Sequence, residues 1–198
     1  MYFWWSDGHL GHGNIIRYCK RPFLQPGDLD INGNWVSPEI ALERTKQHDF
    51  FIIKRFNERV DENDVCFCLG DFCMKKSTEA SDAPQNAFDY YRNQLNCKNI
   101  IFIKGNHDAN NGTKTIIGSI DINFGGRNIH MLHNPKYAKD NYDFNFCGHT
   151  HGTEGVFRKL GKKSVIVDLS VDCWNLAPVE INEINQAYSF WKKGGNLE

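Results

Sequence analysis

The sequence lacks a charge excess of either sign. Its 198 residues include 23 lysines and arginines against 24 aspartates and glutamates, a formal net charge of -1. Long nucleic acids and anionic membranes attract proteins with extended basic surfaces, so this balance disfavours a long-duplex nuclease or a membrane-surface protein. Hydrophobic residues make up 40% and charged residues 24% of the chain, which is typical of a globular protein and not of a disordered one.

Long apolar runs and a disulfide-like cysteine pattern are also missing. No run approaches the roughly 20 apolar residues that span a bilayer, and no basic segment with a long apolar one follows Met1. The seven cysteines are an odd number and lack the spacing of a zinc ribbon. We therefore expect reduced cysteines, a cytoplasmic location, no signal peptide, no membrane association and no obligate protein partner.

Short apolar runs, most of which end in polar motifs, predict an α/β protein. Five runs have the length and composition of buried strands, at residues 2–5, 65–69, 100–103, 129–132 and 144–147. A hairpin is predicted for residues 156–160 and 164–169. Amphipathic spacing predicts helices at residues 38–59, at 84–95 and around 184–191. Because strands and helices alternate in the first half, we expect a parallel or mixed sheet in a single domain that spans residues 1–198.

Eight histidines are many for this length, and their positions matter more than their number. Each of the five predicted strands is followed by a side chain that can bind a metal ion. Sites in open α/β sheets form beyond the carboxyl ends of the strands, so we expect these side chains to gather in one place. The set comprises two carboxylates, one amide and four imidazoles: Asp7, His9, Asp71, Asn106, His133, His149 and His151.

This mixture of ligands predicts a centre of two metal ions. Oxygen and imidazole ligands without a thiolate favour Mn²⁺, iron or Zn²⁺. Two dications about 3.5–4 Å apart can bind the attacking and leaving oxygens of a phosphoryl group, and water bound to them ionises near pH ~7. Each motif alone also fits an ordinary turn or a structural histidine. Their joint occurrence is harder to explain without metal, because Asp7 and Asp71 would repel each other in a partly desolvated cleft.

The order of the motifs resembles a known family. Asp-x-His, Gly-Asp, Gly-Asn-His-Asp, a lone His and Gly-His-Thr-His follow one another from Asp7 to His151. In this order they resemble the calcineurin-like metallophosphoesterase superfamily, and the chain length is similar to that of its small single-domain bacterial and phage-type members. The resemblance implies an α/β fold of the metallo-dependent phosphatase type, a four-layer α/β/β/α sandwich with two mixed sheets. It also implies two divalent transition metal ions, with Mn²⁺ preferred and iron, Zn²⁺ or Ni²⁺ as alternatives.

The resemblance further implies roles for single residues. Asp71 would bridge the two metals, and the remaining ligands would be Asp7, His9 and His151 for one and Asn106, His133 and His149 for the other. His107 would contact the phosphate and protonate the leaving oxygen, while Asp108 would orient His107 or stabilise its protonated form. Met74 stands where some phosphatases of the superfamily pair an aspartate with this histidine, so support for His107 must come from elsewhere.

Two further side chains are candidate substrate ligands. His12 completes Asp-x-His-x-x-His and would donate to the phosphate from the edge of the site, although a solvent-exposed or helix N-terminal histidine fits as well. Arg21 is preferred to Arg17, because the Arg21-Pro22-Phe23 segment favours a fixed loop and a guanidinium suits bidentate phosphate contact.

Together these features predict a dinuclear metal-dependent phosphoesterase in which a metal-bound hydroxide attacks a phosphodiester or nucleotide. The expected binding partner is a phosphoester small molecule, a nucleotide or a short oligonucleotide. A phosphomonoesterase is the alternative. A catalytically silent binding scaffold of the same fold is a further one, although such scaffolds usually lose ligand positions, and all seven are present in this sequence.

Overall fold

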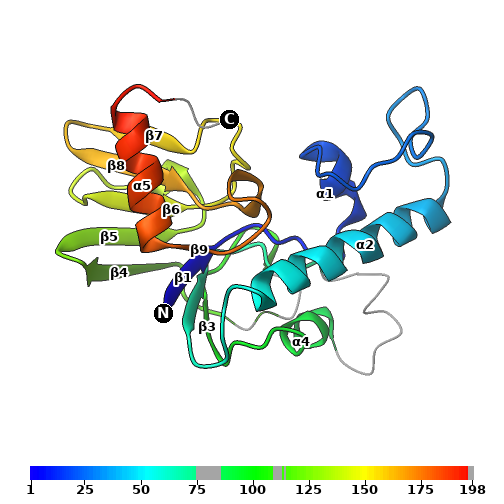
Figure 1. The fold of residues 1–198 in the computed structure, drawn as a ribbon, viewed down its shortest axis with the longest axis horizontal. Coiled ribbons are helices and arrows are strands. Elements are labelled where there is room, and N and C mark those ends of the chain that lie inside the picture. The colour runs from blue at the N-terminus through cyan, green and yellow to red at the C-terminus, as the bar shows by residue number, and fades with distance from the viewer. Residues whose placement is uncertain (75–85, 109–112, 114, 196–198) are drawn as a thin grey trace.

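Two β-sheets form the centre of the protein, shown in the computed structural model of Figure 1. The structure describes residues 1–74, 86–108, 113 and 115–195. The smaller sheet has the order β3-β2-β1-β9, with the strands Asn99–Phe102, Val65–Cys68, Tyr2–Trp5 and Val179–Glu180. The larger sheet has the order β4-β5-β6-β8-β7, with the strands Ser119–Phe124, Arg127–Leu132, Phe144–Cys147, Ser164–Asp168 and Phe157–Leu160.

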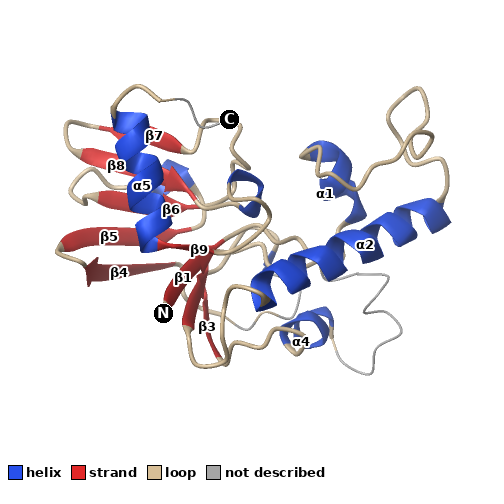
Figure 2. Cartoon of the chain, in the orientation of Figure 1, coloured by secondary structure: helices blue, strands red, loops and turns tan. Residues whose placement is uncertain are grey.

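Both sheets mix parallel and antiparallel pairs. Strands β1, β2 and β3 are parallel, and β9 pairs antiparallel with β1. In the larger sheet β5, β6 and β8 are parallel, while β4 and β7 pair antiparallel at the two edges. Helices flank this pair of sheets (Figure 2). The predicted α/β class with two mixed sheets and flanking helices is therefore confirmed.

A shared apolar core joins the two sheets. Trp4 of β1 stacks on Phe67 of β2 with ring centroids 5.8 Å apart, and its edge meets Phe146 of β6 at 5.6 Å. Alternate residues of a strand point to the same face, so Phe144 also faces this core. There it meets Tyr188 of helix α5, Ile181–Lys192, at 5.2 Å. Figure 1 shows α5 lying across the larger sheet.

Two helices pack on the other face of the smaller sheet. Helix α2, Pro38–Asn57, begins with the Ser37 side chain accepting from the Ile40 N–H and with Pro38 in its first turn. Its Phe56 ring lies 5.0 Å from Trp5, and the apolar cluster around them includes residues of α4, Ala87–Arg92. Helix α1, Gly13–Tyr18, packs against α2 (Figure 1). Each helix in the described part of the chain is too short or too polar to cross a membrane.

The five strands expected to precede site residues are all present, with small shifts at their ends. The helix expected at residues 84–95 is shorter, since α4 begins after the Asn86 cap; residues 84 and 85 lie outside the described residues. The sequence patterns missed β4, β9 and α1. Strand β4 was missed because its alternating exposure leaves few consecutive apolar residues, and β9 because two residues carry no periodicity.

Candidate metal centre

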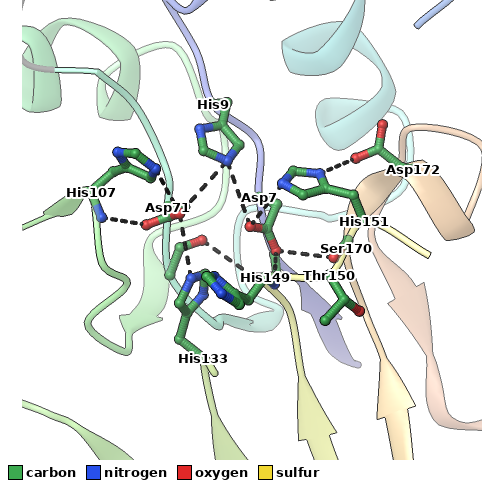
Figure 3. A network of polar contacts seen from close by, with 12 residues as sticks. Asp7, His9, Asp71, His107, His133, His149, Thr150, His151, Ser170 and Asp172 are labelled. Atoms are coloured by element: carbon green, nitrogen blue, oxygen red, sulfur yellow. Dashed lines mark hydrogen bonds and ion pairs between the residues drawn. The ribbon is translucent and has the colours of Figure 1, made fainter. Parts of the chain in front are cut away.

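The predicted ligands gather at the edge of the two sheets where the parallel strands end (Figure 3). Past the strand ends the loops remain side by side: the Asp7 N–H donates to the Gly70 carbonyl, the His9 N–H to the Asp71 carbonyl, and the Gly148 N–H to the His133 carbonyl. These contacts place the loop after β1 beside the loop after β2, and the loop after β5 beside the loop after β6. The His149 N–H, which donates to Asp7 Oδ2, joins the two pairs. Asn106, after β3, joins them because its Oδ1 lies 2.9 Å from His133 Nε2.

Several ligand atoms at the centre are buried without a hydrogen-bond partner among the described residues. They include Asp7 Oδ1 and both ring nitrogens of His9. Asp7 Oδ1 lies 3.6 Å from His9 Nε2 and 3.6 Å from His151 Nε2. Such separations are long for hydrogen bonds. They match the spacing of about 3.4 Å between ligand atoms that bind one tetrahedral ion through bonds of about 2.1 Å. Asp7, His9 and His151 therefore fit a metal ion.

A second group lies beside the first. Asp7, Asp71 and His133 bring their ligand atoms within 4.8 Å of one another. Asp71 Oδ2 is 3.4 Å from His133 Nε2 and 3.7 Å from His9 Nε2, so this carboxylate lies between the two groups. The His149 ring lies 5.1 Å from that of His133. The donor set thus fits two neighbouring ions, and the bridging role of Asp71 stays a prediction.

The backbone is strained at most of these ligands. Asp7, His9, Asp71, His149 and His151 have φ between 49° and 74°, a left-handed conformation that residues other than glycine rarely adopt. Each such residue costs of order 1–3 kcal/mol and persists where the surrounding structure enforces it, often at functional sites. Here the strained turns direct the side chains after the strands inward, toward one another.

Two glycines of the motifs allow the loops to approach closely. A Cβ at Gly105 would lie 2.2 Å from Asp71 Oδ1, and a Cβ at Gly148 would lie 2.2 Å from Asp7 Oδ2. Any side chain at these positions would displace a carboxylate of the centre. The glycines in Gly-Asn-His-Asp and Gly-His-Thr-His are therefore required by the packing of the site itself.

The charged groups of the cluster strongly shift one another's pKa values. Burial acts to raise the pKa of Asp7, but contact with His9 and the charges of His133 and His151 outweigh it and hold that pKa well below its usual range. Burial acts to lower the pKa of His133, but Asp71 and Asp7 outweigh it and raise the pKa to about 9. The pKa of His151 rises to about 10, because Asp172 and Asp7 outweigh its burial. The cluster thus has the carboxylate charge that attracts cations.

His107 and His12 lie at the mouth of the centre. The His107 side chain is 45% exposed, its Nε2 lies 4.0 Å from Asp71 Oδ2, and its backbone N–H donates to Asp71 Oδ1. The His12 ring lies 5.5 Å from that of His9. Burial, and then the neighbouring His9 and His107, lower the pKa of His12 to about 4. His12 is therefore neutral near pH 7 and can donate one N–H toward the site.

Asp108 is buried and binds backbone groups. Its Oδ2 accepts from the N–H groups of Asp71 at 2.9 Å and Gly105 at 2.8 Å. The carboxylate therefore ties the loop after β2 to the loop after β3. These contacts make Asp108 a positioning residue for the two loops, and its predicted action on the His107 ring stays a prediction.

The prediction that Arg21 binds substrate is wrong. The residue is 2% exposed, and all five guanidinium N–H groups have protein acceptors. Its Nε and Nη2 donate to the two carboxylate oxygens of Asp172, Nη2 also donates to the Asp7 carbonyl, and Nη1 donates to the Gly8 carbonyl and to His48 Nε2. No N–H remains for a phosphate, so Arg21 supports the backbone of the Asp7 loop from behind.

Two aspartates that were not predicted as site residues orient the ligands. Asp172 Oδ2 lies 2.7 Å from His151 Nδ1, which leaves the Nε2 of that ring for a metal. Burial acts to raise the pKa of Asp172, but His151 and Arg21 outweigh it and lower the pKa to about 2. Asp168 accepts from the Thr150 hydroxyl and the Gly152 N–H, which fixes the loop that carries His149 and His151. Asp168 ends β8 and Asp172 follows it closely. Their position at the end of a predicted strand is the feature of the sequence that could have identified them as site residues.

Comparisons with known proteins identify relatives of this fold. No family model matches the sequence. An uncharacterized protein of Methanocaldococcus jannaschii is 28% identical over 187 residues, which cover 90% of this chain and 86% of that protein. A crystal structure of a protein of unknown function from Aquifex aeolicus superposes with a TM-score of 0.61 at 16% identity, over 94% of this chain and 98% of that chain.

A structure described as a novel archaeal phosphodiesterase matches with a TM-score of 0.38 at 17% identity, over 84% of this chain and 81% of that chain. The two sheets themselves and the similarity to the Aquifex aeolicus protein show the fold. The chain has the α/β fold of two mixed, helix-flanked sheets that its resemblance to the calcineurin-like metallophosphoesterases implied.

Proposed function

We propose that this protein is a metal-dependent phosphoric ester hydrolase that uses two divalent transition metal ions. The observation that carries the proposal is the set of buried, partnerless ligand atoms on Asp7 and His9, with neighbouring ligand atoms 3.4–3.7 Å apart. Oxygen and imidazole donors suit Mn²⁺ best in this proposal, with iron, Zn²⁺ and Ni²⁺ as alternatives. The family resemblance of the motifs supports the same reading.

The ligands would divide as the resemblance implies, with Asp7, His9 and His151 around one ion, Asn106, His133 and His149 around the other, and Asp71 between them. When bound, the two ions would polarise the phosphoryl oxygens and supply hydroxide at neutral pH for direct attack. Asp172 would hold the His151 ring in the tautomer that presents Nε2. Arg21 and Asp108 would hold the loops, through their bonds to backbone groups.

His107 is the group we propose as proton donor to the leaving oxygen. Its side chain is 45% exposed at the mouth of the centre, so it can reach a bound ester and exchange protons with solvent. Its backbone is anchored to Asp71 Oδ1, which fixes the residue relative to the ligands. His12, neutral and beside His9, would donate a hydrogen bond to a phosphoryl oxygen.

We favour phosphodiester or nucleotide substrates over phosphomonoesters, with a small phosphoester, a nucleotide or a short oligonucleotide as the partner. The near-neutral net charge of -1 gives no support for binding a long duplex. We also propose a cytoplasmic location, which the seven free cysteines support, since oxidising compartments favour disulfides.

The test is hydrolysis of bis(4-nitrophenyl) phosphate and 4-nitrophenyl phosphate after reconstitution with Mn²⁺, iron, Zn²⁺ or Ni²⁺. We expect two bound ions per chain by metal analysis and faster cleavage of the diester. His107→Ala should lower kcat by about 10²–10⁴-fold with the metal content unchanged. If neither ester were cleaved with any of these metals, the proposed hydrolase activity would be refuted. If no metal bound in a stoichiometric amount, the catalytically silent scaffold would be favoured. Faster cleavage of the monoester would reassign the substrate class.

A further inference from the structure

A groove leads away from the metal centre over the outer face of β5. It has a volume of about 490 Å³ and begins at the predicted ligands Asn106 and His133. Pockets of this size accept ligands as large as a nucleotide. We call it the lysine groove; residues that line it beyond the two ligands include Lys104, Ser119, Asn134, Tyr137 and Lys139.

The charge of the lysine groove differs from that of the whole chain. Two lysines line it, and none of the described residues that line it is an aspartate or glutamate. Within the described part of the chain, neither Lys104 nor Lys139 forms an ion pair. Two carboxylates lie beside the groove: Asp71 is 3.4 Å from groove residue His133, and Asp121 is bound to groove residue His130 and accepts from the Tyr142 hydroxyl. The groove therefore presents two cationic groups that form no ion pair in the described part of the chain, although Lys139 is near enough to Asp121 to help lower the pKa of that carboxyl.

The structure holds both lysines in place beside the centre. The backbone N–H and carbonyl of Lys139 are both bonded to the side chain of Asn145, which is fully buried in β6. The same carbonyl accepts from Ser164. Lys104 precedes Gly105 and Asn106, and its N–H donates to the Ile117 carbonyl. Both backbones are thus fixed relative to the centre, while the exposed side chains can adjust to a ligand.

We infer that the lysine groove is a subsite for a second anionic group of the substrate. This inference rests on the proposed function, because one phosphate would occupy the centre while the second reaches the groove. The chemical class it selects is a phosphoester that carries another phosphate, such as a nucleoside bisphosphate or a short oligonucleotide. Lysine ammonium groups bind phosphate as point charges. The exposed ring of Tyr137 gives the connecting nucleoside an apolar surface.

The experiment compares ligand binding, which needs no turnover. Isothermal titration of the Mn²⁺-reconstituted protein is carried out with thymidine 3′,5′-bisphosphate, thymidine 5′-monophosphate and thymidine 3′-monophosphate. The bisphosphate should bind at least about tenfold more tightly than either monophosphate. Lys104→Ala/Lys139→Ala should abolish this preference and leave the Kd of the tighter monophosphate within about twofold.

The matched control removes the same charge elsewhere. Lys192→Ala/Lys193→Ala at the end of α5 should retain the preference for the bisphosphate, which separates local contact from net charge. Equal affinity of the wild-type protein for the three ligands would overturn the inference, as would loss of the preference in the α5 control. Hydrolysis of bis(4-nitrophenyl) phosphate, measured on the same samples, tests the proposed function separately, because that ester has no second phosphate.

Discussion

Two buried polar networks adjoin in this protein and differ in how completely their atoms are paired. The metal cluster, Asp7, His9, Asp71, His133 and His151, has ligand atoms 3.4–3.7 Å apart and several without a hydrogen-bond partner among the described residues. The arginine network behind it comprises Arg21, His48, Asp49, Tyr91 and Asp172. Its contacts are hydrogen bonds of 2.7–3.0 Å.

The hydrogen bonds of the arginine network fix the tautomer of His48. Arg21 has no acceptor, so His48 Nε2 must accept from it and the Nδ1–H must donate to Asp49. Burial, with Arg21 acting in the same direction, lowers the pKa of His48 and keeps the ring neutral. Asp49 also accepts from Gly11 N–H and from the Tyr91 hydroxyl.

This difference in hydrogen bonding distinguishes the arginine network, which supports the structure, from the metal cluster, which is the candidate binding site. Buried polar groups in native proteins are nearly always hydrogen-bonded. A buried polar group without a hydrogen bond therefore needs an explanation, such as a bound ion. In the arginine network the partners are all protein atoms. In the metal cluster the atoms without partners are Asp7 Oδ1 and the two ring nitrogens of His9, and a metal would bind that oxygen and one of the nitrogens. The two networks should therefore respond differently to substitution.

The largest effect is expected from Asp71→Asn in the metal cluster. The substitution keeps the shape but removes the charge between the two groups of ligands, so turnover should be lost and the affinity for both ions should fall. The metal-free variant should unfold at a somewhat lower temperature, because the Asp71 charge that faces the protonated His133 is gone. Metal titration, an ester assay and thermal unfolding measure these effects. Near-normal turnover would contradict the bridging assignment.

Breaking the arginine network should cost mainly stability. Arg21→Ala removes both guanidinium bonds to the partly buried Asp172, which keeps only His151, and leaves the Asp7 and Gly8 carbonyls without this donor; it should lower the free energy of unfolding by about 3–5 kcal/mol, measured by urea denaturation of the metal-free protein. Arg21→Lys, which keeps the charge but not the forked geometry, should lose less. If Arg21→Ala unfolded like the wild type and raised only the KM, the original substrate-binding assignment would be restored.

Gly148→Ala acts at the boundary between the two networks. The new methyl group would collide with Asp7 Oδ2 and Ser6 Oγ, so the carboxylate must move. We expect metal affinity to fall roughly 10–100-fold, as when a supporting contact of a ligand is lost. Gly118→Ala is the control, since a Cβ there meets nothing within 4 Å. Equal metal affinity of the two variants would mean that the Gly148 contact does not position Asp7.

The last comparison needs no substitution: it is a pH dependence confined to the metal cluster. His133 and His151, with pKa values of about 9 and 10, must lose protons to bind metal, so affinity should rise with pH between 6 and 9. The gain is about tenfold per pH unit for each proton released. These raised pKa values also stabilise the metal-free fold below pH 6.5, and that stability should decline as pH rises through 9. An affinity for Mn²⁺ that is independent of pH would contradict these protonation states.

Much of the fold and the candidate ligand set could be predicted from sequence. The runs around Trp4, Phe67 and Phe146 are apolar enough to indicate buried strands, and the motifs that follow them contain metal-binding side chains. Parallel strands bring their carboxyl ends to one edge, so the meeting of Asp7 and Asp71 followed from local pattern and general geometry.

The role of Arg21 could not be predicted in this way. A guanidinium near a phosphate site and a guanidinium buried behind it have the same local sequence, and the difference lies in Asp172, 151 residues away. The lysine groove likewise joins Lys104 after β3 with Lys139 after β5, from two different sheets. The hydrophobic periodicity of the sequence does not indicate that these two lysines lie together.

The sequence by itself determined the kinds of side chain available and the strand ends at which they stand, because hydrophobic patterning and glycine-rich turns are local properties. The tertiary structure decided which of those side chains keep polar atoms without a hydrogen-bond partner and which form hydrogen bonds within the protein. That decision depends on loops meeting across the two sheets, where the carbonyls of Asp7 and Gly8, rather than a phosphate, take up the N–H groups of Arg21.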